Sequence, residues 1–437
     1  MADTAVLTGD AGAADPALAA RLGALDLPAG GFTAPARKAA LARFQAMGLP
    51  RGRDEYWRYT DPAAFNAAVP APMEIADSGP DGPLFEDLDR LRLVFVDGVF
   101  DAEASDDLAL EGVQIDTLAA ADQQADHWAA GVYGTLEAAG QERVARPFGS
   151  LNTAVARDGA LIRVTGKPAR PIHLIHRRAD EGADVYFHHV IVVEPGAEVT
   201  ILETGMTGAR SNYVIEVDVM EGASFHHISA KRAGYQKLGW GGIFARVAAK
   251  ALFKSFNLSL NGTLMRHEAV IDIVGDDAVA HIAGAVLGDG KSGDFAHDDT
   301  VYITHGAERG ESRQVYKKVL KNGAKGIFQG KILVKPGAQK TDGYQISQAL
   351  LLDDDSQFLG KPELEIYADD VKCSHGSTTG AIDETVLFYL RSRGVPKGRA
   401  IVLMVLSFLA DALAEVEDEA LREQISERLD AWLTRHA

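Results

Sequence analysis

Short runs of β-branched and aromatic residues dominate the chain between Leu161 and Leu352. Residues of this kind, in runs too short for helices, predict strands. We therefore expect the middle of the chain to be mainly β. The clearest runs are rich in Val, Ile, Tyr, Phe and His and lie at 172–175, 185–193, 199–202 and 214–219.

A turn recurs between these runs. Pro195-Gly196-Ala197, Glu221-Gly222-Ala223 and Pro336-Gly337-Ala338 each follow one apolar run and precede another. With weaker copies at 247–249, 276–278 and 305–307, the spacing is about 26 to 31 residues, which is typical of stacked supersecondary units. Strand-rich units without helices predict a parallel β-helix, with Gly196, Gly222 and Gly337 at equivalent corners. An antiparallel sandwich with coincidental turns stays open as the alternative.

Helical patterns lie toward the two ends of the chain. Residues 38–47 place apolar side chains on one face, and Gly48 and Pro50 stop the pattern. Asp383 can cap a helix that Gly394 and Pro396 end. An almost wholly apolar stretch, 401–413, follows, and then an amphipathic one with Leu421, Ile425, Leu429 and Trp432 on one face.

These patterns predict four regions. An N-terminal helical region spans 1–90, and a transition segment spans 91–160. The transition segment opens with a hairpin, because Asp97-Gly98 separates two apolar runs. The β-helix core spans 161–380, and a C-terminal helical region spans 381–437. The expected fold class is mainly β, a parallel β-helix with helices on both sides.

Composition narrows the class of protein. A formal net charge of −18 over 437 residues argues against binding to nucleic acid or an anionic membrane surface. One cysteine, Cys373, excludes a disulfide framework. The N-terminus lacks a signal-peptide pattern, and the longest apolar run, 401–410, is about half the length of a membrane helix. We expect a soluble, cytoplasmic protein.

One apparent nucleotide-binding motif lacks the helix that such a motif needs. Residues 285–292 satisfy a relaxed phosphate-loop pattern that ends in Lys291-Ser292. Such a loop needs a helix that starts at the lysine, so that its first amides hold phosphate. Here the chain runs on into another expected strand, 301–304. We expect neither ATP binding nor hydrolysis at Lys291.

Histidines and the lone cysteine are the candidate ligands. Stacked coils could bring strand histidines together as a metal site, although most are expected to be structural. If residues 369–376 are extended, Cys373 and His375 share one face, and their soft and borderline ligands suit iron or sulfide. Lys372 would favour the thiolate. The opposing view is that Cys373 is a small buried apolar residue. The strand histidines are His188, His189, His226, His227, His267, His281, His297 and His305.

Two runs form a family signature. Residues 364–376 (LEIYADDVKCSHG) and 388–394 (FYLRSRG) closely resemble the SufB/SufD family of the Suf iron–sulfur assembly system, and within it the SufD type. The resemblance covers about residues 50 to 410. Supporting matches lie at 330–334, 339–341, 345 and 350–352, with weaker ones at 148–154 and 56–61.

The resemblance implies a right-handed parallel β-helix and a scaffold subunit that is not an enzyme. The implied partners are SufB and the ATPase SufC, which would dock on the C-terminal helices. Cys373 and His375 would lie at the SufB interface and contact iron, sulfide or a cluster transiently, with no cofactor in the isolated chain. The apolar face that would seat the ATPase comprises Ile401, Leu403, Met404 and Leu406.

Three alternatives remain. A SufB-type, cluster-holding paralogue would carry a further cysteine near residues 345–347 and a Glu-His-Glu-Ala run at 373–376, and this chain has neither. A carbohydrate-processing β-helix enzyme would need carboxylates such as Asp298-Asp299 or 353–355 in an open groove. A metalloenzyme would use the strand histidines. The sequence leaves open whether the isolated chain forms a homodimer.

Overall fold

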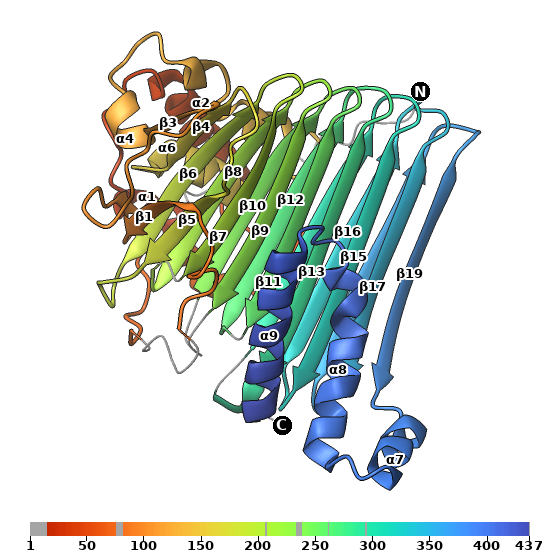
Figure 1. Ribbon diagram of the computed structural model, residues 1–437. Helices are drawn as coiled ribbons and strands as arrows, with labels where there is room; N and C mark the ends of the chain where they lie inside the picture. The colour runs from red at the N-terminus through yellow and green to blue at the C-terminus, as the bar shows by residue number, and fades with distance from the viewer. Residues whose placement is uncertain are drawn as a thin grey trace.

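The computed structural model describes residues 15–75, 82–205, 208–232, 238–260, 262–292 and 295–436. From β4 (Ala160–Val164) onward, successive strands alternate between two facing sheets, so that the chain winds into a β-solenoid of about seven turns (Figure 1). The parallel stack predicted from the turns is therefore confirmed, and the antiparallel sandwich is wrong.

Because successive strands alternate between the two sheets, each sheet is built from every second strand of the chain. All neighbours from β4 and β5 onward pair in parallel. The ten-stranded sheet is ordered β19 (Lys372–Ala381), β17 (Asp342–Leu351), β15 (Glu311–Lys321), β13 (Val279–Asp289), β11 (Leu252–Leu260), β9 (Ser224–Arg232), β7 (Glu198–Gly205), β5 (Ile172–Arg177), β1 (Leu91–Val96) and β2 (Val99–Phe100). The nine-stranded sheet is ordered β18 (Gln357–Ile366), β16 (Lys325–Val334), β14 (Ala296–His305), β12 (Leu264–Ile273), β10 (Leu238–Val247), β8 (Arg210–Val219), β6 (Asp184–Val193), β4 (Ala160–Val164) and β3 (Val113–Thr117).

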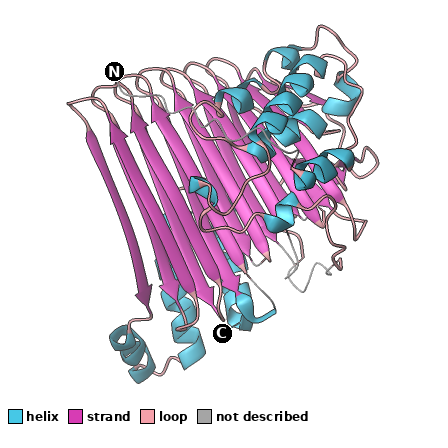
Figure 2. Ribbon diagram, turned by 180° about the vertical axis from the view of Figure 1, so that it is seen from behind, coloured by secondary structure: helices cyan, strands magenta, loops and turns pink. Residues whose placement is uncertain are grey.

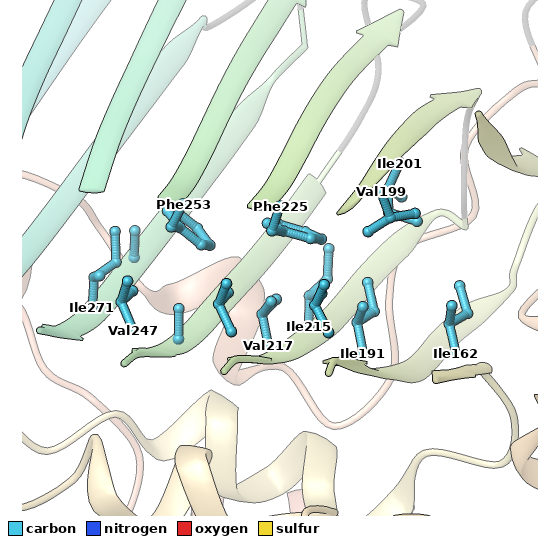
Figure 3. Close-up of a cluster of buried hydrophobic side chains, with 14 of the residues drawn as sticks. Ile162, Ile191, Val199, Ile201, Ile215, Val217, Phe225, Val247, Phe253 and Ile271 are labelled. Atoms are coloured by element: carbon cyan, nitrogen blue, oxygen red, sulfur yellow. The ribbon is translucent and has the colours of Figure 1, made fainter. Parts of the chain in front are cut away.

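The main core lies between the two sheets. Because alternate side chains of a strand point to opposite faces, every second residue enters the solenoid. In-register stacking then forms rows of like residues, such as Ile162, Ile191 and Val217 on one sheet and Phe225 and Phe253 on the other (Figure 3). The Phe225 and Phe253 rings stack with centroids 5.4 Å apart.

The corners of the solenoid repeat one backbone geometry. Gly196, Gly222 and Gly337 have φ of 73°, 67° and 86°, values that glycine adopts without strain. The N–H of Gly196 donates to the carbonyl of Glu221 on the next coil, and this contact recurs along the stack. At the corner that contains Gly337, the inter-coil bond is made by Lys340. Other coils place a non-glycine residue at the left-handed position, namely Lys250, Asp277 and Arg309.

The N-terminal segment packs on the outer face of the nine-stranded sheet (Figure 2). The predicted hairpin is present, because β1 and β2 pair antiparallel around Asp97 and Gly98, whose φ angles are both positive. β1 also pairs in parallel with β5, so the solenoid begins within the predicted transition segment. The helices here are α1 (Pro16–Gly23), α2 (Ala34–Met47), α3 (Ala63–Asn66), α4 (Leu118–Ala121), α5 (Thr135–Ala139) and α6 (Pro147–Val155), with single 3-10 turns at η1 (Glu55–Trp57) and η2 (Trp128–Gly131).

Polar clamps fix this segment to the solenoid. The Arg266 guanidinium lies 4.2 Å from the centroid of the Trp57 ring and pairs with Glu268 and Asp298. Thr60 donates to the same Asp298 carboxylate. On α6, Asn152 donates to the carbonyl of Phe187. The family-like runs at 56–61 and 148–154 therefore hold the N-terminal region in place.

Three helices end the chain: α7 (Glu384–Ser392), α8 (Lys397–Leu413) and α9 (Glu419–His436). Asp383 caps α7 as predicted, since its carboxylate accepts from the backbone N–H groups of Thr385 and Val386. Helices α8 and α9 cover the outer face of the ten-stranded sheet, and α7 lies beyond the last strand (Figure 1). No helix in the described ranges is both long and apolar enough to cross a membrane.

Candidate functional site

The last coil of the solenoid is open. Strands β18 and β19 end the two sheets, and in the described chain no further strand pairs with either of them. A terminal strand presents unpaired N–H and carbonyl groups along its free edge. Most of the β19 side chains are exposed, in contrast to the buried strands of the inner coils. This end of the molecule is thus available to another chain.

Cys373 and His375 lie on β19, two residues apart and on the same face, as predicted. They stack on Gly343 and Gln345 of β17. Cys373 is half-buried and packs with the apolar cluster that contains Ile332. A side chain at Gly343 would come within 3.3 Å of the Cys373 sulfur, so the glycine leaves room for the thiol. His375 is exposed.

The electrostatics of the thiol differ from the sequence-based expectation. Burial raises the pKa of Cys373, although a backbone hydrogen bond from Gly343 opposes the shift. Lys372, which was expected to favour the thiolate, is exposed at the neighbouring strand position. Because adjacent strand residues point to opposite faces, its ammonium is directed away from the sulfur. In the isolated chain the cysteine is therefore a protonated thiol at neutral pH.

The C-terminal helices divide their apolar residues between the solenoid and solvent. Val402, Val405 and Leu409 of α8 are buried against the sheet. Of the predicted ATPase-docking residues, Ile401 and Leu406 also pack partly against this core, whereas Leu403 is 38% exposed. Met404 is intermediate in exposure. On α7, Val386, Phe388 and Tyr389 are exposed at 43%, 73% and 55%. The sequence analysis did not identify these three residues as an exposed apolar surface.

Lys291 lies in a single 3-10 turn, η3 (Gly290–Ser292), between β13 and β14. Among the described residues between these strands, this turn of three residues is the only helical segment, and it is too short to offer a helix N-terminus for phosphate. The geometry agrees with the sequence argument against a phosphate loop.

Several strand histidines are buried and paired with carboxylates. His188 Nε2 lies 2.8 Å from Glu216, which also accepts from the backbone N–H of Gly134 and so joins the N-terminal segment to β8. Inside the solenoid, Glu203 lies between His176 and His227, at 3.2 and 3.4 Å. These contacts support the expectation that most strand histidines are structural.

A second interior cluster contains His267 of β12, His297 and Asp299 of β14, and Lys318 of β15. Asp299 lies 2.6 Å from the Lys318 ammonium and 3.3 Å from His297 Nδ1. Sequence reasoning missed Lys318 and Glu203. Both are charged residues at inward strand positions that otherwise carry apolar side chains. A charged residue in the apolar half of the strand alternation was the signal that could have identified them.

The aspartates considered for a carbohydrate-processing enzyme are engaged elsewhere. Asp298 points outward and is neutralised by Arg266, while Asp299 points inward to Lys318. Asp353 accepts from the backbone N–H groups of Asp355 and Ser356 and so shapes a turn. None of these carboxylates forms an exposed acid–base pair in a groove of the described chain.

Comparison with known proteins agrees with this geometry. The family model described as "SUF system FeS cluster assembly, SufBD core domain" matches residues 176–408, and that for the "SufBD protein N-terminal region" matches 32–170. The chain is 29% identical over 412 residues to the iron-sulfur cluster assembly protein SufD of Escherichia coli strain K12, covering 90% of this chain and 92% of that protein. It is 27% identical to the SufBD family protein slr0076 of Synechocystis sp., with 89% and 88% covered. Identity to Bacillus subtilis SufD is 25% over 290 residues, or 63% of this chain and 64% of that protein.

Proposed function

Because this chain belongs to the SufB/SufD family of iron–sulfur cluster assembly proteins, we propose that it is a non-catalytic scaffold subunit that builds clusters together with partners. The partners are a SufB-type subunit and the ATPase SufC. The complex is cytoplasmic, and the chain is of the SufD type.

One observation carries the proposal: the terminal coil presents Cys373 and His375 at the open end of the solenoid. A thiol and an imidazole suit iron and sulfide. They are two ligands, whereas an iron–sulfur cluster takes four. The chain would therefore need a subunit that stacks on its last coil and supplies the remaining ligands. Iron, sulfide or a cluster is then a transient substrate at this junction.

The exposed residues of α7 and α8 support a second contact, with the ATPase. Ile401, Leu403, Met404 and Leu406 remain the proposed seat, and the exposure of Leu403 makes it the member most accessible to a partner. Aromatic side chains in exposed positions, such as Phe388, are typical anchors of interfaces. The ATPase would supply nucleotide chemistry that the loop at Lys291 does not support.

The test is reconstitution with the SufB-type and SufC-type proteins of the same source. We expect the three proteins to co-purify and the complex to assemble clusters, with a lower yield when this chain is omitted. Equal cluster yield without the chain, together with failure to co-purify, would contradict the scaffold role.

A matched pair of variants tests the ATPase contact. Leu403→Asp should weaken capture of the ATPase by about tenfold or more, because a charge replaces an apolar contact. Leu27→Asp is the control, since Leu27 is 50% exposed but lies in the N-terminal region. Equal ATPase capture by both variants would remove Leu403 from the docking surface.

A further inference from the structure

The interior cluster of His267, His297, Asp299 and Lys318 has the composition of a metal site. One ligand atom from each of His267, His297 and Asp299 lies within 4.8 Å of the other two. Two imidazoles and one carboxylate form the ligand set typical of ferrous iron and also suit zinc and cobalt. The three residues come from two neighbouring coils, because His267 and Asp299 are paired positions of β12 and β14.

The separations are close to those of a bound ion. Asp299 lies 3.3 Å from His297 Nδ1 through Oδ2 and 3.7 Å from His267 Nδ1 through Oδ1. His267 Nδ1 also lies 2.6 Å from the side-chain amide of Asn257, which a bound ion would have to replace. Ligands about 2.1 Å from a tetrahedral ion lie about 3.4 Å from one another, so small side-chain movements would close the site. The two imidazole rings stand nearly perpendicular, with centroids 5.1 Å apart, and so bring their edges to one region.

A cation already occupies this position. The Lys318 ammonium lies 2.6 Å from Asp299 and 3.2 Å from His297 Nδ1, and Lys318 is wholly buried. Burial of a lysine requires compensating partners, and here those partners are two of the three metal-type ligands. The ammonium therefore takes the position that a metal cation would take in this cluster.

His297 and His267 differ in how far they are enclosed. His297 is fully buried, and its Nε2 has no hydrogen-bond partner in the described part of the chain. The nitrogen that faces Asp299 and Lys318 is Nδ1, and this unpartnered Nε2 is the other nitrogen of the same ring. His267 is 13% exposed and is the member of the cluster that solvent reaches.

We propose that His267, His297 and Asp299 form a reversible binding site for a divalent transition metal, with ferrous iron as the favoured ion, and that Lys318 competes with the metal for Asp299. The site holds its ion weakly because an ammonium must be displaced. It lies inside the solenoid, apart from Cys373 and His375, and binding by the isolated chain does not depend on the partners proposed above.

Titration of the purified chain with Co²⁺, followed by visible absorption, tests the site, and anaerobic Fe²⁺ competes for it. We expect one ion per chain and a rise in melting temperature with metal. Asp299→Asn and His297→Gln should lower the affinity by about 10- to 100-fold or more. Lys318→Gln should raise it, an effect that a purely structural cluster would not produce.

His281→Gln is the matched control, because His281 pairs with Glu311 and Glu415 on the outer face. It should leave binding unchanged. Should the buried variants fail to fold, His267→Gln at the partly exposed member gives the same test. Binding that is unaffected by all cluster variants, or lost in His281→Gln instead, would overturn the proposal.

Discussion

Charged side chains inside the solenoid occur in compensated sets. Burial disfavours the charged form of Asp299, yet the Lys318 ammonium and the contacts with His297 and His267 together outweigh this cost and hold the pKa of Asp299 well below its usual range. Burial lowers the pKa of His297, so its imidazole is neutral. Cys373 differs because it is half-buried at the end of the stack, where burial and the Asp342 carboxylate both raise its pKa. A partner that brings a cation to the sulfur would shift the thiol toward thiolate.

The first prediction concerns the two residues at the open end. Cys373→Ser and His375→Ala should each reduce cluster formation by the assembled complex, because serine and alanine lack the soft and borderline ligands. His375→Ala should change stability by less than about 0.5 kcal/mol, since the side chain is exposed. Cys373→Ser should cost about 1 kcal/mol for the partly buried hydroxyl.

Cluster reconstitution and thermal melts distinguish the ligand role from a packing role. Ser374→Ala, on the opposite face of β19, is the control and should have no effect. A loss of yield in Cys373→Ser that only follows unfolding would support the packing role. Full yield with unchanged melting in both variants would leave neither residue a function.

At the scale of elements, the corners and the strands were predictable from the sequence, while most side-chain contacts between different strands were not. Gly196 and Gly222 are recognisable because glycine adopts positive φ readily. Lys250 and Arg309 hold the same geometry without that signal, since the inter-coil hydrogen bonds impose it.

In the candidate site and the interior cluster, too, local features were predictable from the sequence and contacts between strands were not. That Cys373 and His375 share a face follows from the two-residue strand period, which is a local property. Lys318 and Asp299 come from opposite sheets, so their contact depends on how the coils are closed and not on their spacing in the chain.

The corner geometry predicts that two substitutions, Gly196→Ala and Lys250→Gly, change the free energy of unfolding in opposite directions. At Gly196 a Cβ atom would meet nothing within 4 Å, so Gly196→Ala costs only the left-handed backbone conformation, about 1–2 kcal/mol. Lys250→Gly relieves the same strain, with φ of 57°, and should stabilise the chain by up to about 1 kcal/mol. Urea unfolding measures both. Equal effects of the two substitutions would show that the corner geometry is unstrained.

At the scale of the whole molecule, buried neutral histidines make stability depend on pH. His305 accepts or donates a 2.8 Å hydrogen bond with Ser312, and burial lowers its pKa to about 4. Burial likewise lowers the pKa of His173 to about 3. In the unfolded chain both groups bind protons below about pH 6.5. The folded state therefore gains its full advantage above that pH and loses it as the pH falls toward 4.

We expect His305 alone to reduce the free energy of unfolding by about 2 kcal/mol between pH 7.5 and 5.0. His305→Gln should flatten this dependence, because glutamine does not titrate. His375→Gln is the control, since His375 is exposed. Urea unfolding at the two pH values provides the measurement. A wild-type dependence retained in His305→Gln would assign the acid sensitivity to other groups.

The two ends of the solenoid differ, and this difference limits how large an assembly can become. At the N-terminal end, the sheets finish in the antiparallel strands β2 and β3, which have two and five residues and so offer only a short free edge. At the other end, β18 and β19 continue it unpaired. A stack with two open ends would polymerise head to tail into a fibre. Two chains that met here through their ten-residue terminal strands would each cover the long free edge of the other, so that assembly would stop at a pair.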